Sequence, residues 1–423
     1  RGSFSHKMTD RAYRTYFSRF IYIGACLVMS LGVFNLVVDP YDIFRVISIS
    51  GVNANKIMAS KNMRMHKAYA VVRKKPQSII LGNSTAEAAL SPEYTGFTNG
   101  PVYNLAIPGA TMYEILRNFE HAHATRHLHT VLLSLDFSSF EIYPVLQQGD
   151  FNEERLTTRD GFLSPWIPLY KTDLLSSLFS LEATKMSFAT LRKQTDLDDC
   201  LDNGMRDWNI SLKGMVREKG VVASFNDTED FLARGIAALP AEKRERKSQE
   251  RMYGYLQKLI VTCYRDDIRL IVLIPPNHVR RNVLLNLTGM GEVWNAWKRK
   301  VVVLNQELAT KYDKKLFPVW DFSGPSDYTT ELLPREAGKA GEMQWQWESA
   351  HYKRALGDLV LARVLPDGHV LPRGAASFGE VLTPANIDAV FRKQAFALQK
   401  YIETHPQDVA EIDQIRKRYP YQY

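Results

Sequence analysis

The stretch Ser78-Ile-Ile-Leu-Gly-Asn-Ser-Thr85 decides the fold of this chain. Its first four residues form a short apolar run, which is typical of a strand buried on both faces. The Gly-Asn pair that follows is turn chemistry and ends the strand. We therefore predict a buried strand over 78–81 that runs into a sharp turn, with Gly82 and then Ser84 at its carboxyl end.

Four further apolar runs alternate with helical stretches along the chain. This alternation predicts an α/β fold, with a parallel sheet covered by helices on both faces. Ligands in such folds bind beyond the carboxyl ends of the strands, so residues that follow the strands are expected to meet at one rim. The predicted strands are Ser78–Leu81, Val102–Ile107, Thr130–Leu135, Arg269–Ile274 and Leu316–Phe322. The residues expected at the rim are Gly82, Asn83, Ser84, Pro108, Gly109, Asp136, Pro276, Asn277 and Asp321.

Three segments fall outside the alternation and suggest the domain boundaries. Residues 1–45 contain an apolar run, and about 141–250 is mixed, polar and helical in spacing. We interpret the latter as an insertion or cap over the rim of a domain that spans 46–366. Residues 367–423 are set off by Pro-Asp-Gly and Pro-Arg-Gly and are expected to form one or two C-terminal helices.

The apolar run Phe20–Val38 carries no charge and has the length of a membrane-spanning helix. The arginines that precede it are Arg11, Arg14 and Arg19. A positive flank on the amino side predicts an uncleaved anchor with a cytoplasmic amino terminus and an exported body. A cleaved signal peptide and a buried soluble helix are the alternatives. Residues 1–8 resemble an expression remnant that ends at a start methionine.

Composition excludes several classes of protein. At 423 residues and 45% hydrophobic content, the chain can bury a substantial core. Its net charge of +8 is spread out without a dense basic run, so no nucleic-acid partner is expected. The three cysteines form no metal-spaced pair, and we interpret the alternating histidines over 121–129 as surface residues. We expect neither a metal nor a cofactor.

A second motif, Trp347-Glu-Ser-Ala-His-Tyr352, places a carboxylate three residues before a histidine, at the start of a predicted helical stretch. A serine hydroxyl is a poor nucleophile at neutral pH and needs a base and a third group that orients the base. Ser84, His351 and Glu348 fit these three roles. Taken singly, Gly-Asn-Ser also fits an ordinary turn, and Glu-x-x-His fits a surface hydrogen bond on a helix.

Together these motifs resemble the SGNH hydrolase superfamily over roughly 76–140 and 268–365. The resemblance implies a flavodoxin-like sheet, with Ser84 as nucleophile and His351 as base. It further implies that the amides of Ser84 and Gly109, the latter in Asn-Leu-Ala-Ile-Pro-Gly, form the oxyanion hole. Glu348 stands where the family usually has aspartate.

The third block of the family departs from its usual Gly-x-Asn-Asp. This chain reads Ser-Leu-Asp-Phe-Ser over 134–138, and an ionised Asp136 cannot donate a hydrogen bond to an oxyanion. Asn277 at the next strand end is one substitute, and the amides of Ser84 and Gly109 alone are the other. Trp347 is expected to line the site, either stacked on a sugar ring or packed in the core.

Within the superfamily, the anchor followed by Val-Asp-Pro-Tyr resembles a membrane-anchored periplasmic subgroup. Its relatives O-acetylate alginate or cellulose, or take part in the D-alanylation of teichoic acid. The resemblance implies a bacterial inner-membrane protein with a periplasmic body, a polysaccharide acceptor, and a multi-spanning membrane acyltransferase as partner. Acyl transfer, ester hydrolysis and a non-catalytic scaffold in an exopolysaccharide complex all remain open at this point.

Overall fold

The computed structural model of the chain describes residues 3–140, 151–156, 171–238, 247–335, 341–366, 371–372 and 374–419. The chain divides into two compact units. The first comprises Arg1–His66 and Ser164–Asp198, and the second comprises Lys67–Leu163 and Asp199–Tyr423. The stretch 141–250, which the sequence suggested as one insertion, therefore contributes to both units.

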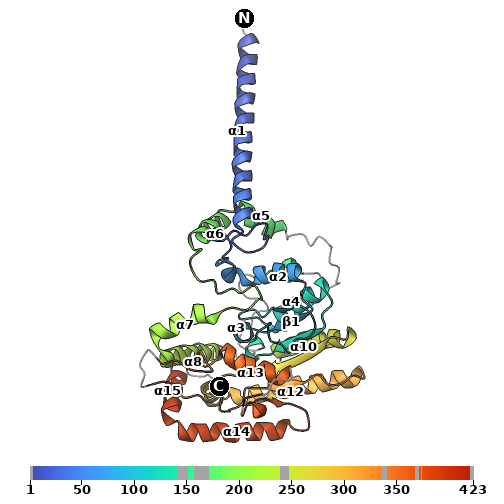
Figure 1. Ribbon diagram of the computed structural model, residues 1–423, viewed down its shortest axis with the longest axis vertical. Helices are drawn as coiled ribbons and strands as arrows, with labels where there is room; N and C mark the ends of the chain where they lie inside the picture. Colours follow the sequence, from blue (N-terminus) through green and yellow to red (C-terminus); the bar gives the residue numbers. More distant parts are fainter. Residues whose placement is uncertain are drawn as a thin grey trace. The chain divides into compact units, whose positions relative to one another are not determined.

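Helix α1 (Ser3–Val38) dominates the first unit and runs without interruption (Figure 1). In the described part of the chain it is the one helix long and apolar enough to cross a membrane, judged by length and composition. Only 17% of its most apolar window is buried, whereas a core helix of a soluble protein would be mostly buried. The helix is thus consistent with a single-pass membrane anchor.

The carboxyl end of α1 is tied to two short helices, α5 (Lys171–Phe179) and α6 (Leu181–Arg192). The buried Asn35 side chain donates to the Leu178 carbonyl oxygen and to Thr184 Oγ1. Immediately after the helix, the Asp39 carboxylate accepts the three successive amides of residues 43–45, at 2.8–3.0 Å. These hydrogen bonds hold the carboxyl end of the apolar helix in place through polar side chains.

A six-stranded sheet forms the centre of the second unit, in the order β2-β1-β3-β4-β5-β6. The strands are β1 (Ser78–Leu81), β2 (Val102–Asn104), β3 (Thr130–Ser134), β4 (Arg269–Ile274), β5 (Val319–Asp321) and β6 (Glu380–Val381). The first five pair in parallel, in the 2-1-3-4-5 order of flavodoxin-like folds, and β6 is antiparallel. The predicted α/β class and parallel sheet are confirmed.

Both faces of this sheet are buried, because successive residues of a strand point to opposite sides. Ile79, Val131 and Val272 enter one apolar cluster with helices α4, α10 and α12. Ile80, Leu132 and Ile271 enter the other, with α3 and α13. This arrangement explains why the strands are continuous apolar runs rather than alternating ones.

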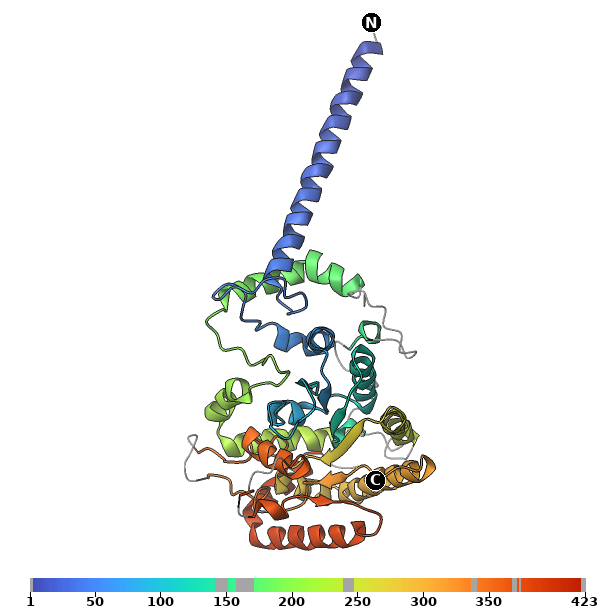
Figure 2. The ribbon, with the colours of Figure 1, turned by 45° about the vertical axis from the view of Figure 1, so that its right-hand side comes forward.

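The helices of the second unit connect and flank these strands (Figure 2). Helix α15 packs against α8 and α11, so the C-terminal helices belong to the same unit as the sheet. Their bounds are α2 (Met63–Lys74, which begins in the first unit), α3 (Ser84–Ala89), α4 (Met112–Thr125), α7 (Trp208–Lys219), α8 (Val221–Ala237), α10 (Lys247–Arg265), α11 (Val279–Leu287), α12 (Met290–Lys311), α13 (Arg354–Val364), α14 (Ile387–Thr404) and α15 (Pro406–Lys417).

Several details of the sheet differ from expectation. Strand β5 covers only Val319–Asp321 of the predicted Leu316–Phe322, and β3 ends at Ser134 rather than Leu135. Strand β6 was not predicted, because two residues with an intermediate and an exposed side chain leave no periodic signal. Strand β2 ends at Asn104 rather than Ile107, although the chain continues beside β1. The amide of Leu105 donates to the Ile80 carbonyl oxygen, and the amide of Ile107 donates to that of Gly82. This continuation carries Gly109 to the same rim as Ser84.

Candidate active site

The turn after β1 is built around Gly82 and Asn83. Gly82 has φ 151°, and a Cβ atom there would lie 2.8 Å from the Ser134 carbonyl oxygen, so only glycine fits without strain. Asn83 caps α3, since its Oδ1 accepts the Thr85 amide at 3.0 Å. Ser84 is therefore the first residue of a capped helix at the carboxyl end of a central strand.

Ser84, His351 and Glu348 form one hydrogen-bonded chain. Ser84 Oγ lies 2.7 Å from His351 Nε2, and His351 Nδ1 is hydrogen-bonded to Glu348 Oε1. The second Glu348 oxygen accepts the Ala350 amide at 2.8 Å. An ionised Glu348 selects the tautomer with hydrogen on Nδ1, which leaves Nε2 as the acceptor for the serine proton. The sequence predicted this juxtaposition, and the structure has it.

The electrostatics of Glu348 suit an orienting carboxylate. Burial by itself raises the pKa of this group, whose residue is only 3% exposed. The charge and hydrogen bond of His351, with hydrogen bonds from Ala350 and Thr228, outweigh burial and lower the pKa of Glu348 below its usual value. Glu348 is therefore ionised at neutral pH, and the extra methylene relative to aspartate still lets it reach the imidazole.

His351 lies in a tight turn rather than in a helix. The Trp347 amide donates to the His351 carbonyl oxygen at 2.9 Å, and helix α13 begins only at Arg354. The expectation that the Glu-x-x-His pair opens a helical stretch was wrong, because this backbone bond closes the turn first. The Ser349 carbonyl oxygen accepts the His278 amide at 3.0 Å, which fixes the turn to the segment after β4.

Ser84 and Gly109 line one cavity together with His351. The Ser84 amide is the first of α3, and Gly109 lies in the loop after β2 with φ 66°. Within the part of the chain that the structure describes, neither amide donates a hydrogen bond. Both are thus available to an oxyanion that develops beside Ser84.

Asp136 also lines the cavity, but as an acceptor. Its Oδ1 accepts the Ser138 amide at 2.7 Å and lies 3.4 Å from Arg281 Nη2. Burial by itself would raise the pKa of Asp136. The charge of Arg281 and the hydrogen bonds of Ser138 outweigh the effect of burial, so the pKa of Asp136 lies below its usual value. The ionised carboxylate cannot replace the amide donor of the usual third block. Arg281, a cation of this cavity, was not predicted, since an arginine in a helix carries no distinguishing motif.

The two remaining predicted site residues lie outside this cavity. The Asn277 amide group donates to the His278 carbonyl oxygen and to Oδ1 of Asn282 in helix α11, so its donors are already used. That occupation gives no support to Asn277 as an oxyanion donor. Trp347 packs with Ala88 and Trp208 and lines a neighbouring pocket instead.

Trp208, which the sequence did not single out, lies against the catalytic histidine candidate. Its ring centroid is 4.5 Å from that of His351, with the planes 40° apart. Trp208 opens helix α7, so a segment of the predicted insertion helps hold the imidazole in place. A lone tryptophan between polar residues gives no periodic or motif signal.

The cavity at Ser84 is small, with a volume of about 120 Å³. One wall consists of Thr228, Phe231 and Leu232 from helix α8. The rest is lined by the residues around Ser84, Gly109, Asp136 and His351. Helix α8, which lies in the stretch predicted as an insertion or cap, thus lines the candidate site.

The structure shows no metal-binding cluster among the residues it describes. The histidine run, expected at the surface, is only partly exposed. His121 is buried with Nε2 3.0 Å from the Ala68 carbonyl oxygen, and burial lowers the pKa of His121 to about 4. Its role is therefore in the core.

No protein family matches the sequence, and no curated protein resembles it closely enough to count as a match.

Proposed function

We propose that this protein is a serine-dependent acyltransferase or esterase of the SGNH type that acts on a polysaccharide. The observation that carries the proposal is the chain Ser84 Oγ···His351 Nε2 and His351 Nδ1···Glu348, beside two unengaged amides. The sheet order and the place of Ser84 at the end of β1 support the same assignment, because ligands of such sheets bind at the carboxyl ends of β1 and β3.

The chemistry follows from these positions. His351 removes the proton of Ser84 as Oγ attacks the acyl carbonyl, and the amides of Ser84 and Gly109 hold the oxyanion, at roughly 2.7–4 kcal/mol for each donor. Collapse breaks the ester C–O bond, and His351 returns the proton to the leaving oxygen. A sugar hydroxyl, activated by the same imidazole, then attacks the acyl-serine and releases Ser84. Water in place of the sugar gives hydrolysis.

The size of the cavity favours a short acyl group. A volume of about 120 Å³, bounded by Phe231 and Leu232, accommodates an acetyl group more readily than a long chain. We therefore propose O-acetylation as the transfer reaction. The test is a series of p-nitrophenyl esters, for which kcat/KM should fall steeply from acetate to octanoate.

We further propose that the body lies in the periplasm, anchored by α1 in the inner membrane. The charge asymmetry around α1 supports this orientation, since arginines precede the apolar segment. An anchored enzyme is held where an acyl group leaves a multi-spanning membrane acyltransferase, which raises its effective concentration there. Protease added to spheroplasts should degrade the body; protection of the body while a periplasmic control is digested would disprove this topology.

A second candidate is a non-catalytic scaffold in an exopolysaccharide complex. It is favoured by Asp136, which places a buried ionised acceptor where an oxyanion donor would serve. The scaffold requires only binding surfaces, so Ser84 would be unreactive.

A fluorophosphonate probe separates the two candidates. The full chain in neutral detergent should label at Ser84, and Ser84→Ala should abolish the labelling. Ser377→Ala, which removes an exposed hydroxyl that donates to the Gly374 carbonyl oxygen, should label like the wild type. Absence of labelling in folded wild-type protein would favour the scaffold.

A further inference from the structure

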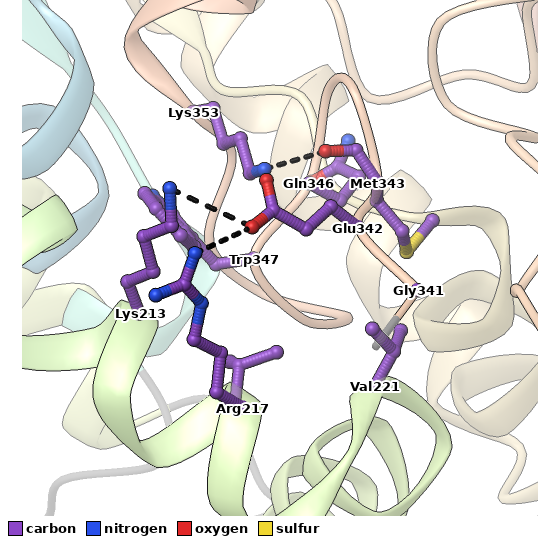
Figure 3. A pocket seen from close by; sticks show the side chains of 10 residues that line it. Lys213, Arg217, Val221, Gly341, Glu342, Met343, Gln346, Trp347 and Lys353 are labelled. Carbon is purple, nitrogen blue, oxygen red and sulfur yellow. Dashed lines mark hydrogen bonds and ion pairs between the residues drawn. The ribbon is translucent and has the colours of Figure 1, made fainter. Parts of the chain in front are cut away.

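A second pocket is lined by the turn that carries His351. Its volume is about 410 Å³, more than three times that of the Ser84 cavity. The lining side chains come from helix α7, from Val221 at the start of α8 and from residues 341–353 (Figure 3). Helix α7 and residues 341–353 also reach the candidate active site, because the Trp208 ring of α7 lies tilted against the His351 ring and Trp347 precedes Glu348.

The pocket holds three cations and one carboxylate. Glu342 Oε1 lies 3.5 Å from Lys213 Nζ and 3.4 Å from Arg217 Nη2, and the charge of Lys213 leads the effects that lower the pKa of Glu342 (Figure 3). Lys353 Nζ donates to the Met343 carbonyl oxygen, and its charge also helps to lower the pKa of Glu342. One carboxylate therefore faces an excess of positive charge.

The other residues that line the pocket are uncharged, and most of them are apolar. Val216, Val221 and Met343 provide apolar surface. Lys353 Nζ lies 4.5 Å from the centre of the Trp347 ring, so this ring supports a cation rather than offering a free face for stacking. Gln346 also lines the pocket, and its residue is only 1% exposed.

The amide group of Gln346 gives an independent indication of a ligand. Neither its Nε2 nor its Oε1 has a hydrogen-bond partner among the described residues, although both atoms are buried. A buried primary amide with neither donor nor acceptor satisfied is unfavourable, and the exceptions in native proteins call for an explanation. Hydroxyl groups, which both donate and accept, match such an amide.

We propose that this pocket binds an acidic sugar residue of the acceptor polysaccharide, with its carboxylate on Lys213 and Arg217 in place of Glu342. The inference rests on the proposed function, since it makes the pocket an acceptor subsite of the Ser84 reaction. A uronic acid residue combines one carboxylate with several hydroxyl groups, which are the two chemistries that the pocket offers. A wholly neutral glycan would leave the excess of positive charge unmatched.

Direct binding tests the pocket without requiring catalysis. The probe is a tetramer of a uronic acid, titrated calorimetrically into full-length Ser84→Ala protein in neutral detergent. The carboxyl-reduced tetramer, which is neutral, should bind at least tenfold more weakly. The Lys213→Gln/Arg217→Gln double variant should bind the acidic tetramer about tenfold more weakly, as expected for two partly exposed ion pairs.

A matched control comes from the same helix. Lys219 lies at the end of α7, pairs with Asp227 at 2.7 Å and does not line the pocket. Lys219→Gln should leave the affinity within twofold. Equal binding of the acidic and neutral tetramers, or an equal loss in Lys219→Gln, would overturn the proposal.

Two further measurements separate related explanations. Glycerol 3-phosphate tests for a phosphate headgroup; if it binds as tightly as the tetramer and depends equally on Lys213 and Arg217, the assignment to an acidic sugar is wrong. Labelling of Ser84 in the wild type tests the proposed function separately. Labelling without tetramer binding disproves only the subsite, and binding without labelling supports the subsite but disproves the catalytic proposal.

Discussion

The Ser84 cavity and the Lys213 pocket use charged groups in opposite ways. In the cavity, Glu348 has a side chain that is 5% exposed and a defined partner for each oxygen. In the pocket, the Arg217 side chain is 64% exposed and shares Glu342 with Lys213. A buried group whose polar atoms each have a defined partner is positioned before a ligand arrives, whereas exposed cations can adjust to the ligand. The first arrangement should give large, all-or-none effects of substitution, and the second should give small effects that salt screens.

The largest expected effect is the loss of Ser84 or His351. If the two act as one unit, Ser84→Ala and His351→Ala should each lower kcat on p-nitrophenyl acetate by about 10³-fold or more. The double variant should lose little more than either single variant. Independent, multiplying losses would show that the hydrogen bond between the two side chains has no part in the reaction.

Glu348→Gln should lose less, about 10²–10³-fold in kcat, since the imidazole stays in place but loses the carboxylate that stabilises its protonated form.

The same variant tests the pH dependence of stability. The folded pKa of Glu348 is lowered, so its contribution to stability is complete above the unfolded value of about 4.3 and is lost as the pH falls through the folded value. The wild type should therefore lose more stability than Glu348→Gln between about pH 5 and pH 3, as measured by urea unfolding.

Much of the fold was predictable, because the buried strands of the sheet are continuous apolar runs in the sequence. Ser78–Leu81 and Arg269–Ile274 were predicted to the residue. The division of 141–250 between the two units was not predictable, since it depends on contacts between distant segments such as Asn35 with Leu178. Local periodicity carries no information about such pairs.

The candidate site was predictable where chemistry restricts the choice of residue. Ser84 and Gly109 follow strands and sit in turns that demand glycine, and His351 follows a carboxylate at fixed spacing. Trp208 and Arg281 were missed, because their side chains reach the site through tertiary packing rather than through a local motif. Parts of a site that come from helix faces need the structure.

The contrast between buried and exposed charge can be tested on helix α2 through its effect on stability. Lys67 and Glu87 are fully buried, with Nζ 2.9 Å from Oε1, and Lys67 also donates to the Ala106 carbonyl oxygen. This pair joins α2 to the helix of Ser84 and to the loop of Gly109. Lys67→Met leaves the Glu87 carboxylate buried without its partner and should lower the free energy of unfolding by about 3 kcal/mol. The Lys67→Met/Glu87→Leu double variant should recover most of this loss; if it is no more stable than the single variant, packing rather than charge dominates.

The smallest effect is expected at the other end of the same helix. Lys74 pairs with Asp202 at 2.5 Å, but the Asp202 side chain is 65% exposed and Lys74 is 26% exposed. Water solvates both groups before and after the pair breaks, so Lys74→Gln should change the free energy of unfolding by less than about 1 kcal/mol. Urea unfolding of the two variants, at low and at high salt, measures the difference directly. Salt should reduce the effect of Lys74→Gln and leave that of Lys67→Met nearly unchanged, because ions screen the exposed pair and cannot reach the buried one. A loss of 3 kcal/mol or more in Lys74→Gln would show that burial does not set the scale of charge effects here, and the comparison between the Ser84 cavity and the Lys213 pocket would lose its basis.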